Sequence, residues 1–369
     1  MTDIRIPDEL LPADGRFGSG PSRIRDAQLQ DLVARGRDVL GTSHRQAPVK
    51  QLVGAVRAQL AELFTLPDGY EIVLGNGGAT AFWDAAAFGL IRERAQVASF
   101  GEFGGKFAKA AAAPWLQAPD VRQAPSGEVA LLEAAEGIDL YATPHNETST
   151  GAMITPRRVA AEGALTMVDA TSSAGGTEID LRETDVYYFS PQKNFGSDGG
   201  LWFTVLSPAA LERVASVAAS GRYIPDSLSL THAIENSRKE QTLNTPAVAT
   251  LSLLESQLRW MLEFGGLSAV AARTKASSDY LYTWADARAW VTPFVQQPEY
   301  RSQLIATLDL APEVDSAQLR GVLREHGIVD IDPYRKLGRN QLRVGTFASV
   351  PTEDIERLAA AIDYVAERL

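Results

Sequence analysis

The chain has 369 residues, a formal net charge of −11 at pH 7, no cysteine and 45% hydrophobic residues. Its length exceeds one compact domain of roughly 100–200 residues, and its hydrophobic content excludes a disordered chain. The lack of cysteine excludes disulfides, thiolate metal sites and cysteine nucleophiles, and the acidic balance argues against a protein that binds nucleic acid through a basic surface.

The N-terminal segment, residues 1–16, is acidic and lacks the basic and apolar regions of a signal peptide. No later stretch approaches the roughly 18 uninterrupted apolar residues that a membrane span needs. We therefore expect a cytoplasmic protein that binds neither a membrane nor nucleic acid, and an enzyme is the first hypothesis.

Short apolar runs alternate with helix-like stretches in the first half of the chain. Six runs have the length of strands and are rich in β-branched or aromatic residues: 71–75, 96–100, 139–143, 164–170, 185–190 and 200–206. Alanine-rich segments at 79–95 and 103–113 predict helices between them. This alternation predicts an α/β fold with a mostly parallel sheet, in which a ligand binds beyond the carboxyl ends of the strands.

The pattern changes beyond Ser207. The predicted elements are one long amphipathic helix at 246–282, a strand at 301–310, a helix at 317–327, a strand at 340–347, and a C-terminal helix at 352–369 with Thr352 as its N-cap. We expect a large domain of residues 17–256 and a smaller α+β domain of residues 257–369, with residues 1–16 packing alongside the smaller domain.

Two residues at predicted strand ends carry the strongest chemical signal. Lys193 follows the run 185–190 in a polar, glycine-flanked loop, where a lysine with a lowered pKa becomes a nucleophile toward carbonyl compounds. Asp169 lies at the end of the run 164–170, and pyridoxal phosphate enzymes need such a carboxylate beside the pyridinium nitrogen. Either residue alone also fits a solvated lysine or a turn-forming aspartate, so it is the ordered pair that favours pyridoxal phosphate chemistry.

The glycine-rich turn after the run 71–75 predicts an anion site. Backbone N–H groups near Gly78 and Ala79 would face a phosphate at the start of a helix. The turn has neither the GK[ST] of a Walker A loop nor the spacing of a dinucleotide fingerprint, and a plain strand-to-helix turn is the alternative.

Further motifs narrow the choice of chemistry. Thr148 follows the run 139–143 and therefore shares a sheet edge with Asp169 and Lys193. The four histidines lack metal-ligand spacing, so we expect no metal site. No GxSxG motif occurs, which argues against an α/β-hydrolase.

Eight motifs, in chain order, resemble those of the phosphoserine aminotransferases, which belong to class V of the fold-type I pyridoxal phosphate enzymes. The motifs are FGSGPSRI, GTSHRQAP, GNGGATAFWD, HNETSTG, VDATSSAGG, YYFSPQKNFG, TLNTPA and NQLRVGTF. The similarity extends from about Arg16 to the C-terminus and is greatest to the actinobacterial branch. It implies pyridoxal 5'-phosphate as the cofactor and amino transfer between L-glutamate and 3-phosphohydroxypyruvate, giving O-phospho-L-serine and 2-oxoglutarate in serine biosynthesis.

The resemblance also implies roles for single residues around the cofactor. Lys193 is the Schiff-base lysine, and Asp169 is the partner of the pyridine nitrogen. Phe103 stacks on the cofactor ring, and Thr148 hydrogen-bonds the cofactor near its phenolic oxygen. The cofactor phosphate is implied to be held from both subunits of a homodimer with shared active sites: by Gly78, Ala79 and Gln192 of one subunit, and by Asn244 and Thr245 of the other.

Substrate binding is implied for residues at both ends of the chain. Arg343 clamps the substrate α-carboxylate, which suits the forked guanidinium group. His44 and Arg45 face the side-chain anion, which is either the phosphate or the glutamate γ-carboxylate. Ser19 lies near the substrate end.

Two positions depart from the pattern of the resembled family. Ala79 stands where many members carry an arginine that adds a phosphate contact. Many members also carry a His-Arg pair seven residues before the carboxylate arginine, where this chain has Lys336. One of Arg335, Lys336 and Arg339 is expected to substitute, and the sequence leaves open which.

Three other kinds of protein are alternatives to a phosphoserine aminotransferase. An alanine–glyoxylate-type aminotransferase of the same class needs no basic groups for a substrate phosphate. A cysteine desulfurase requires a cysteine and is excluded by composition. A non-catalytic, ligand-binding member of the fold would usually have lost Lys193 or Asp169, and both are present.

Overall fold

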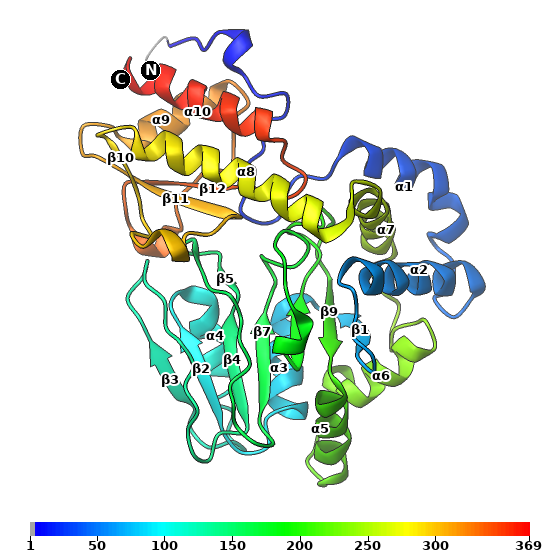
Figure 1. Cartoon of the computed structure of the whole chain (residues 1–369). Helices are drawn as coiled ribbons and strands as arrows, with labels where there is room; N and C mark the ends of the chain where they lie inside the picture. The colour runs from blue at the N-terminus through cyan, green and yellow to red at the C-terminus, as the bar shows by residue number, and fades with distance from the viewer. Residues whose placement is uncertain (1–3) are drawn as a thin grey trace.

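The computed structural model describes residues 4–369, with a seven-stranded sheet in the lower body of Figure 1 and a three-stranded sheet in the upper body. The strands of the large sheet are β1 (Glu71–Asn76), β2 (Ala95–Ser99), β3 (Asp120–Gln123), β4 (Leu140–Pro144), β7 (Leu165–Asp169), β8 (Val186–Phe189) and β9 (Leu201–Leu206). Their spatial order is β1-β9-β8-β7-β4-β2-β3, and β9 runs antiparallel to both of its neighbours. The other pairs are parallel, which confirms the predicted α/β fold.

Each of the six predicted strands corresponds to a strand of this sheet. In β8, Val186 and Tyr188 join the hydrophobic cluster on one face, and Tyr187 and Phe189 join the cluster on the other. A strand that is covered on both faces is apolar at every position and therefore stands out in the sequence. β3 lies outside the predicted set because it is a short edge strand whose residues are all partly or fully exposed.

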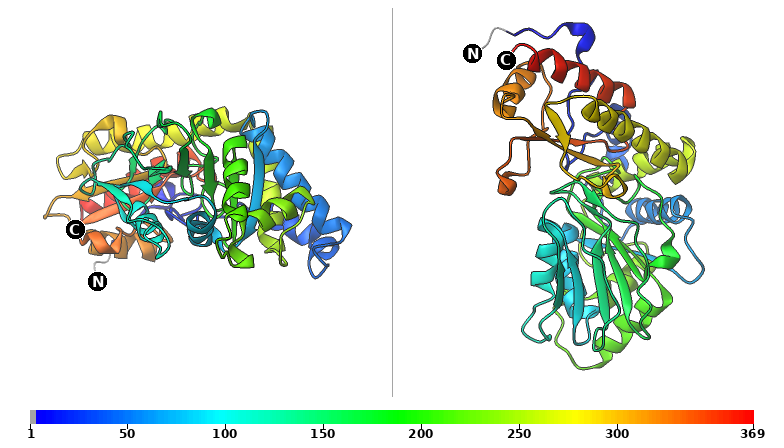
Figure 2. Two further views of the ribbon diagram at one scale, coloured as in Figure 1. Left: turned by 90° about the horizontal axis from the view of Figure 1, so that it is seen from below. Right: turned by 60° about the vertical axis from the view of Figure 1, so that its left-hand side comes forward.

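Helices cover both faces of the large sheet, as the views in Figure 2 show. They are α2 (Ala47–Leu63), α3 (Gly78–Gly89), α4 (Glu102–Ala110), α5 (Pro208–Ala219), α6 (Leu230–Arg238) and α7 (Val248–Glu263), and α1 (Asp26–Val39) packs against α7. One hydrophobic cluster packs α3, α4 and α5 against the sheet, and the opposite cluster packs α2 and α7. Among residues 4–369, every helix is too short or too polar to cross a membrane.

The upper body is an antiparallel sheet covered by three helices. Its elements are β10 (Val291–Pro293), β11 (Ile305–Leu310), β12 (Gln341–Gly345), α8 (Gly266–Asp286), α9 (Ser316–Glu325) and α10 (Thr352–Ala366). The short elements of the chain are β5 (Asn146–Glu147), β6 (Ala152–Met153) and the 3-10 helices Asp8–Leu10, Leu181–Glu183, Asp226–Leu228, Pro298–Tyr300 and Arg335–Leu337.

The prediction of a single long helix at 246–282 is wrong. The structure has two helices there, α7 and α8, because Gly265 (φ 117°) and Gly266 (φ 73°) adopt left-handed conformations that interrupt the helical hydrogen bonds. α7 packs against α1 and α2, whereas α8 packs against α10 and β10. The apolar periodicity is continuous through the break, so only the glycine pair marks it.

Thr352 is also not the N-cap of the last helix. Pro351 occupies the cap position, and Thr352 is the first helical residue. The Thr352 hydroxyl instead forms a hydrogen bond of 2.9 Å with the hydroxyl of Ser277 on α8. A tertiary contact therefore replaces the local cap that the sequence predicts.

The N-terminal segment packs on the upper body. Ile6 belongs to the hydrophobic cluster of that body, and Ile4, Leu10 and Leu11 pack against the cluster. Residues 1–3 of the predicted segment 1–16 lie outside the described residues. The division of the chain at residue 256 falls inside α7 and stays a prediction.

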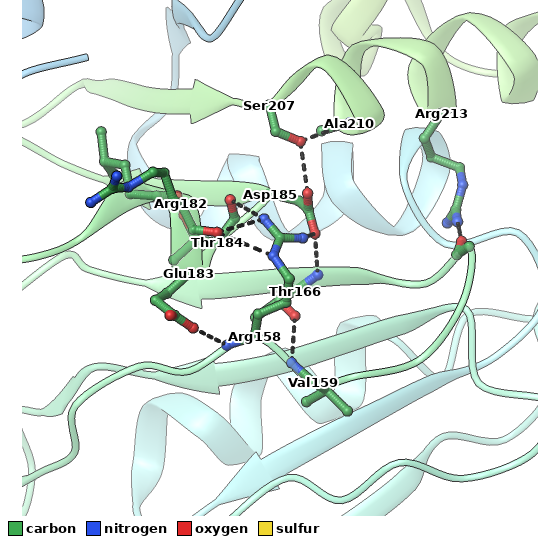
Figure 3. Close-up of polar contacts among 12 residues, drawn as sticks. Arg158, Val159, Thr166, Arg182, Glu183, Thr184, Asp185, Ser207, Ala210 and Arg213 are labelled. Carbon is green, nitrogen blue, oxygen red and sulfur yellow. Dashed lines mark hydrogen bonds and ion pairs between the residues drawn. The ribbon is translucent and has the colours of Figure 1, made fainter. Parts of the chain in front are cut away.

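The buried carboxylate of Asp185 connects neighbouring segments at the edge of the large sheet where β7 and β8 begin (Figure 3). Asp185 is 2% exposed and accepts hydrogen bonds from the Thr166 N–H at 2.9 Å and the Ser207 hydroxyl at 2.8 Å. Arg158 pairs with the same carboxylate and also donates to the carbonyl of Thr184. The carboxylate is thus supplied with donors on both oxygens, as a buried charge requires.

Candidate active site

A cavity of about 410 Å³ lies at the opposite edge of the large sheet, where its parallel strands end. The loops that follow β1, β4, β7 and β8 form its walls, and the start of α4 adds a further side. Seven predicted site residues line it: Gly78, Ala79, Phe103, Thr148, Asp169, Gln192 and Lys193. Residues that are far apart in the sequence meet here because parallel strands bring their carboxyl ends to one edge.

Lys193 lies in the loop after β8 and is 8% exposed. Its Nζ donates a hydrogen bond of 2.8 Å to the backbone carbonyl of Ser19. Burial, together with the Arg343 guanidinium, lowers the pKa of Lys193 to about 8. An amine with that pKa is partly neutral near physiological pH and can act as a nucleophile.

The segment that approaches Lys193 requires a glycine. Gly20 has a φ of 129°, and a Cβ at this position would overlap the Nζ of Lys193. The sequence predicts Ser19 near the substrate end of the site, and the structure places its backbone carbonyl against the lysine amine.

Asp169 is the last residue of β7 and lines the cavity. Its Oδ1 accepts a hydrogen bond of 2.9 Å from the Thr171 N–H, and its backbone carbonyl accepts one from the His145 N–H. His145 is 2% exposed, and burial lowers its pKa to about 3, so its ring is neutral. Asp169 therefore presents a carboxylate to the cavity, and no cationic side chain of residues 4–369 forms an ion pair with it.

α3 begins at the cavity with two glycines in left-handed conformations. Gly77 (φ 110°) is the N-cap, and Gly78 (φ 72°) is the first helical residue. The first N–H groups of a helix have no helical partners, and the helix dipole favours an anion beside them. In the same cavity, Gln192 Oε1 and Thr171 Oγ1 are buried with no hydrogen-bond partner among the described residues.

These groups fit pyridoxal 5'-phosphate. Lys193 offers an amine for its aldehyde, Asp169 a carboxylate for its pyridine nitrogen, and the start of α3 N–H donors for its phosphate. Phe103 adds an aromatic face, and its ring centroid lies 5.9 Å from Lys193 Nζ. The Thr171 hydroxyl, which is buried without a partner among the described residues, is a donor that an anionic ligand would satisfy.

Arg343 reaches this region from β12 in the upper body. Its Nη1 donates a hydrogen bond of 3.2 Å to the backbone carbonyl of Thr148, and its guanidinium lies 5.4 Å from the ring centroid of Tyr334. Its Nε is buried without a partner among the described residues, and burial lowers the pKa of Arg343. A guanidinium with a free donor suits a carboxylate ligand.

The structure separates the basic residues that precede β12. Lys336 Nζ lies 2.5 Å from Glu102 Oε1, and Glu102 directly precedes the cavity residue Phe103. Arg339 pairs instead with Asp309 on β11, with Nη2 2.6 Å from Oδ2. Arg335 is exposed.

Four predicted residues gather elsewhere on the surface of the single chain. His44 Nδ1 lies 3.2 Å from the Thr245 hydroxyl, and Asn76 Nδ2 lies 3.4 Å from the Asn244 carbonyl. Arg45, Asn244 and Thr245 are exposed. None of these residues is among the described residues that line the cavity with Lys193.

Several cavity residues lie outside the predicted set. They include Gly20, Pro21, Thr80, Trp83, Asn146, Thr171, Ser172 and Ser190. Asn146 donates a hydrogen bond of 2.8 Å to the Ser172 hydroxyl. Both belong to the motifs that contain Thr148 and Asp169, so the position of a polar residue within those motifs is the signal that identifies them.

Comparison with known proteins agrees with this geometry. The sequence model of the family described as aminotransferase class-V matches residues 25–330. The chain is 56% identical to a phosphoserine aminotransferase of Nocardioides sp. over the full length of both chains, and 52% identical to one of Corynebacterium glutamicum over 100% of this chain and 98% of that relative. Its fold matches the crystal structure of a phosphoserine aminotransferase from Cytophaga hutchinsonii, with a TM-score of 0.87, 20% identity, and coverage of 95% of this chain and 99% of that chain.

Proposed function

The chain belongs to the class-V aminotransferase family, and from this premise we propose that it is a phosphoserine aminotransferase that uses pyridoxal 5'-phosphate. It transfers an amino group between L-glutamate and 3-phosphohydroxypyruvate, giving O-phospho-L-serine and 2-oxoglutarate. The observation that carries this proposal is the single cavity in which Lys193, Asp169 and the start of α3 meet. We place the reaction in serine biosynthesis in the cytoplasm.

Six groups of this chain would hold the cofactor. Lys193 would bind it through its amine, and Asp169 would face the pyridine nitrogen. Phe103 would cover one face of the ring, and Thr148 would hydrogen-bond near the phenolic oxygen. The phosphate would be held by N–H donors of the first turn of α3, including those of Gly78 and Ala79, and by the side chain of Gln192.

Pyridoxal phosphate, when bound, supplies an electron sink for the negative charge that develops at the substrate α-carbon. Lys193 moves the proton at that carbon, first as general base and then as general acid. Its lowered pKa of about 8 suits both roles, because the two protonation states are then both populated near neutral pH. Asp169 keeps the positive charge at the ring nitrogen stable through its carboxylate.

We assign the substrate α-carboxylate to Arg343. Its guanidinium is held beside Thr148 and retains a donor without a protein partner among the described residues. Both substrates of the reaction carry an α-carboxylate, so one arginine serves both half-reactions.

For the substrate phosphate we propose Lys336 rather than Arg339. Lys336 is bonded to Glu102, which directly precedes the cavity residue Phe103, whereas Arg339 is bonded to Asp309 on β11, which does not line the cavity. Lys336→Ala should raise the KM for O-phosphoserine about tenfold, as expected for one lost charged contact. Arg339→Ala is the matched control, and an equal rise in both variants would contradict the assignment.

We further propose a homodimer with shared active sites. The contact between His44 and Thr245 keeps the two loops together, so a partner that receives Asn244 and Thr245 at its cofactor phosphate would receive His44 and Arg45 as well. In the proposed dimer, His44 and Arg45 face the side-chain anion of the substrate. Mixing inactive Asn244→Ala and Lys193→Ala proteins should restore some activity in hybrid dimers, whereas independent sites would show no complementation.

A spectrum and an assay test the proposed function. The purified protein should show a visible absorption band of bound pyridoxal phosphate that is absent in Lys193→Ala, and it should convert O-phosphoserine in the presence of 2-oxoglutarate. Activity with alanine but not with phosphoserine would favour the alanine–glyoxylate type. A colourless protein that does not bind added cofactor would favour the non-catalytic alternative.

A further inference from the structure

Glu147 is a fully buried carboxylate for which the proposed chemistry has no use. It lies between Asn146 and Thr148, which line the cavity, but its own side chain turns toward α4. Its Oε2 accepts hydrogen bonds from the N–H groups of Phe103 at 3.0 Å and Gly104 at 3.1 Å. A carboxylate with no exposed surface is costly to bury, so this arrangement calls for a reason.

The partners of Glu147 are all hydrogen-bond donors. Its Oε1 accepts from the Ser149 hydroxyl at 2.7 Å and from the Ser149 N–H at 3.2 Å. The same hydroxyl accepts a hydrogen bond of 3.0 Å from the Glu102 N–H while it donates its own proton to the carboxylate. Burial raises the pKa of Glu147, whereas these donors and the positive end of α4 stabilise its ionised form.

The backbone is shaped for this contact. A Cβ at Gly101 would overlap the Glu147 side chain, so the residue before α4 has to be glycine for the carboxylate to reach the helix. The N–H groups of Glu102, Phe103 and Gly104 then all have acceptors from the segment 147–149. The start of α4 is therefore tied to the loop that carries Thr148.

This tie bears on the site through Phe103. Phe103 is the second residue of α4 and lines the cavity with its ring, 5.9 Å from Lys193 Nζ to the ring centroid. The direction of a helical side chain follows from its backbone. We propose that Glu147 is a positioning residue, which as an anion fixes the start of α4 so that the Phe103 ring presents its face to the cofactor.

The competing explanation is a carboxylate that merely stabilises the fold. Asp185 provides the control for cofactor binding, because it is also a buried carboxylate with a backbone N–H and a serine hydroxyl as donors, although it additionally pairs with Arg158. It directly precedes β8 (Figure 3), whereas Glu147 follows β4, so the two carboxylates lie at opposite ends of the parallel strands. A purely structural role predicts that Glu147→Gln and Asp185→Asn behave alike.

The experiment compares Glu147→Gln and Asp185→Asn with the unmodified chain. The readouts are the Kd for pyridoxal 5'-phosphate, the visible circular dichroism of the bound cofactor, and Tm. Both variants should lower Tm, but only Glu147→Gln should weaken cofactor binding, by about tenfold, and reduce the dichroic band. Equal changes of Kd and band in the two variants would overturn the proposal.

A double-mutant cycle tests the route through Phe103. In a Phe103→Leu background, Glu147→Gln should change the cofactor Kd less than about twofold, because contacts that act as a unit are not additive. A full tenfold effect in that background would contradict the proposal. If Glu147→Gln does not fold, Ser149→Ala serves in its place, since it removes a donor to Glu147 and the acceptor of the Glu102 N–H; about threefold weaker binding is then expected.

The inference rests on the proposed cofactor site, and the two can fail separately. An unmodified chain without a Lys193-dependent visible band would refute the proposed function. A normal band in that chain, with no difference between Glu147→Gln and Asp185→Asn, would refute only the role of Glu147.

Discussion

The two edges of the large sheet use buried polar groups differently. At the edge where β7 and β8 begin, the carboxylate of Asp185 is supplied by Arg158 and by backbone and hydroxyl donors (Figure 3). At the edge where those strands end, Gln192 Oε1 and Thr171 Oγ1 are buried without partners among the described residues. The carboxylate of Asp185 is satisfied within the chain, whereas the oxygens of Gln192 and Thr171 are left without a partner beside the cavity.

The charged groups Lys193 and Asp139, at opposite edges of the sheet, also differ in how many partners they have. Its amine is buried with a backbone carbonyl as its one hydrogen-bond partner in the described chain, and its pKa falls to about 8. Asp139, at the other edge, accepts the N–H groups of Arg92, Glu93 and Arg94 at 2.7 to 2.8 Å and also pairs with Arg213. Changes at Lys193 and at Asp185 should therefore separate activity from stability.

The largest effect is expected from Lys193→Ala. Amino transfer should fall at least about 10³-fold, because the group that moves the proton is lost. Tm of the cofactor-free protein should change little, since removal of a desolvated amine offsets the loss of its hydrogen bond to the Ser19 carbonyl. A single-turnover assay and a thermal melt measure both, and a variant that unfolds would break the contrast between the edges.

Arg343→Ala should have the next largest effect. Both half-reactions should slow about 100-fold, because a buried guanidinium that meets a carboxylate contributes strongly and both substrates carry that group. Stopped-flow traces with glutamate and with phosphoserine measure the two halves separately. A loss confined to one of them would show that Arg343 does not bind the α-carboxylate.

Asp185→Asn should destabilise the chain without affecting chemistry. We expect the free energy of unfolding to fall by about 2 kcal/mol, because the partly exposed Arg158 and the neighbouring donors lose a charged acceptor. Urea denaturation gives this value, and kcat of the folded variant should stay within about twofold. A large loss of kcat with unchanged stability would show that Asp185 contributes to the chemistry rather than to stability.

The smallest effect concerns pH and the cofactor-free protein. The pKa of Lys193 is about 8 in the fold against 10.5 for an ordinary lysine, so between these pH values the unfolded chain binds more protons and stability rises with pH. Relative to Lys193→Met, the free energy of unfolding should therefore increase by at most about 3 kcal/mol from pH 8 to pH 10.5. A flat difference would mean that Lys193 titrates normally in the fold.

Much of the fold can be predicted from local pattern. The central strands are apolar at every position because helices cover both of their faces, so each of the six appears in the sequence. The break between α7 and α8 is hidden, because the apolar period continues across Gly265 and Gly266. The prediction that Thr352 caps the last helix is wrong because the Thr352 hydroxyl bonds to Ser277 on α8, a contact that a local sequence pattern does not show.

The candidate site divides in the same way. The types of Lys193 and Asp169, and their places after two strands, already indicate carbonyl and pyridine chemistry. The choice among Arg335, Lys336 and Arg339 stays open in the sequence, because all three are cations within one short segment. Their pairing with Glu102 or Asp309 distinguishes them only after the chain has folded.

What the sequence determines by itself is the order of the strands along the chain and the chemical type of each group at their ends, because both are local properties. The tertiary structure decides which of these groups act together. Lys193 meets Ser19 across 174 positions, Arg343 meets Thr148 across 195, and Glu147 reaches the N–H of Phe103 across 44. Such contacts depend on how the sheet and its loops pack, and no local pattern encodes that packing.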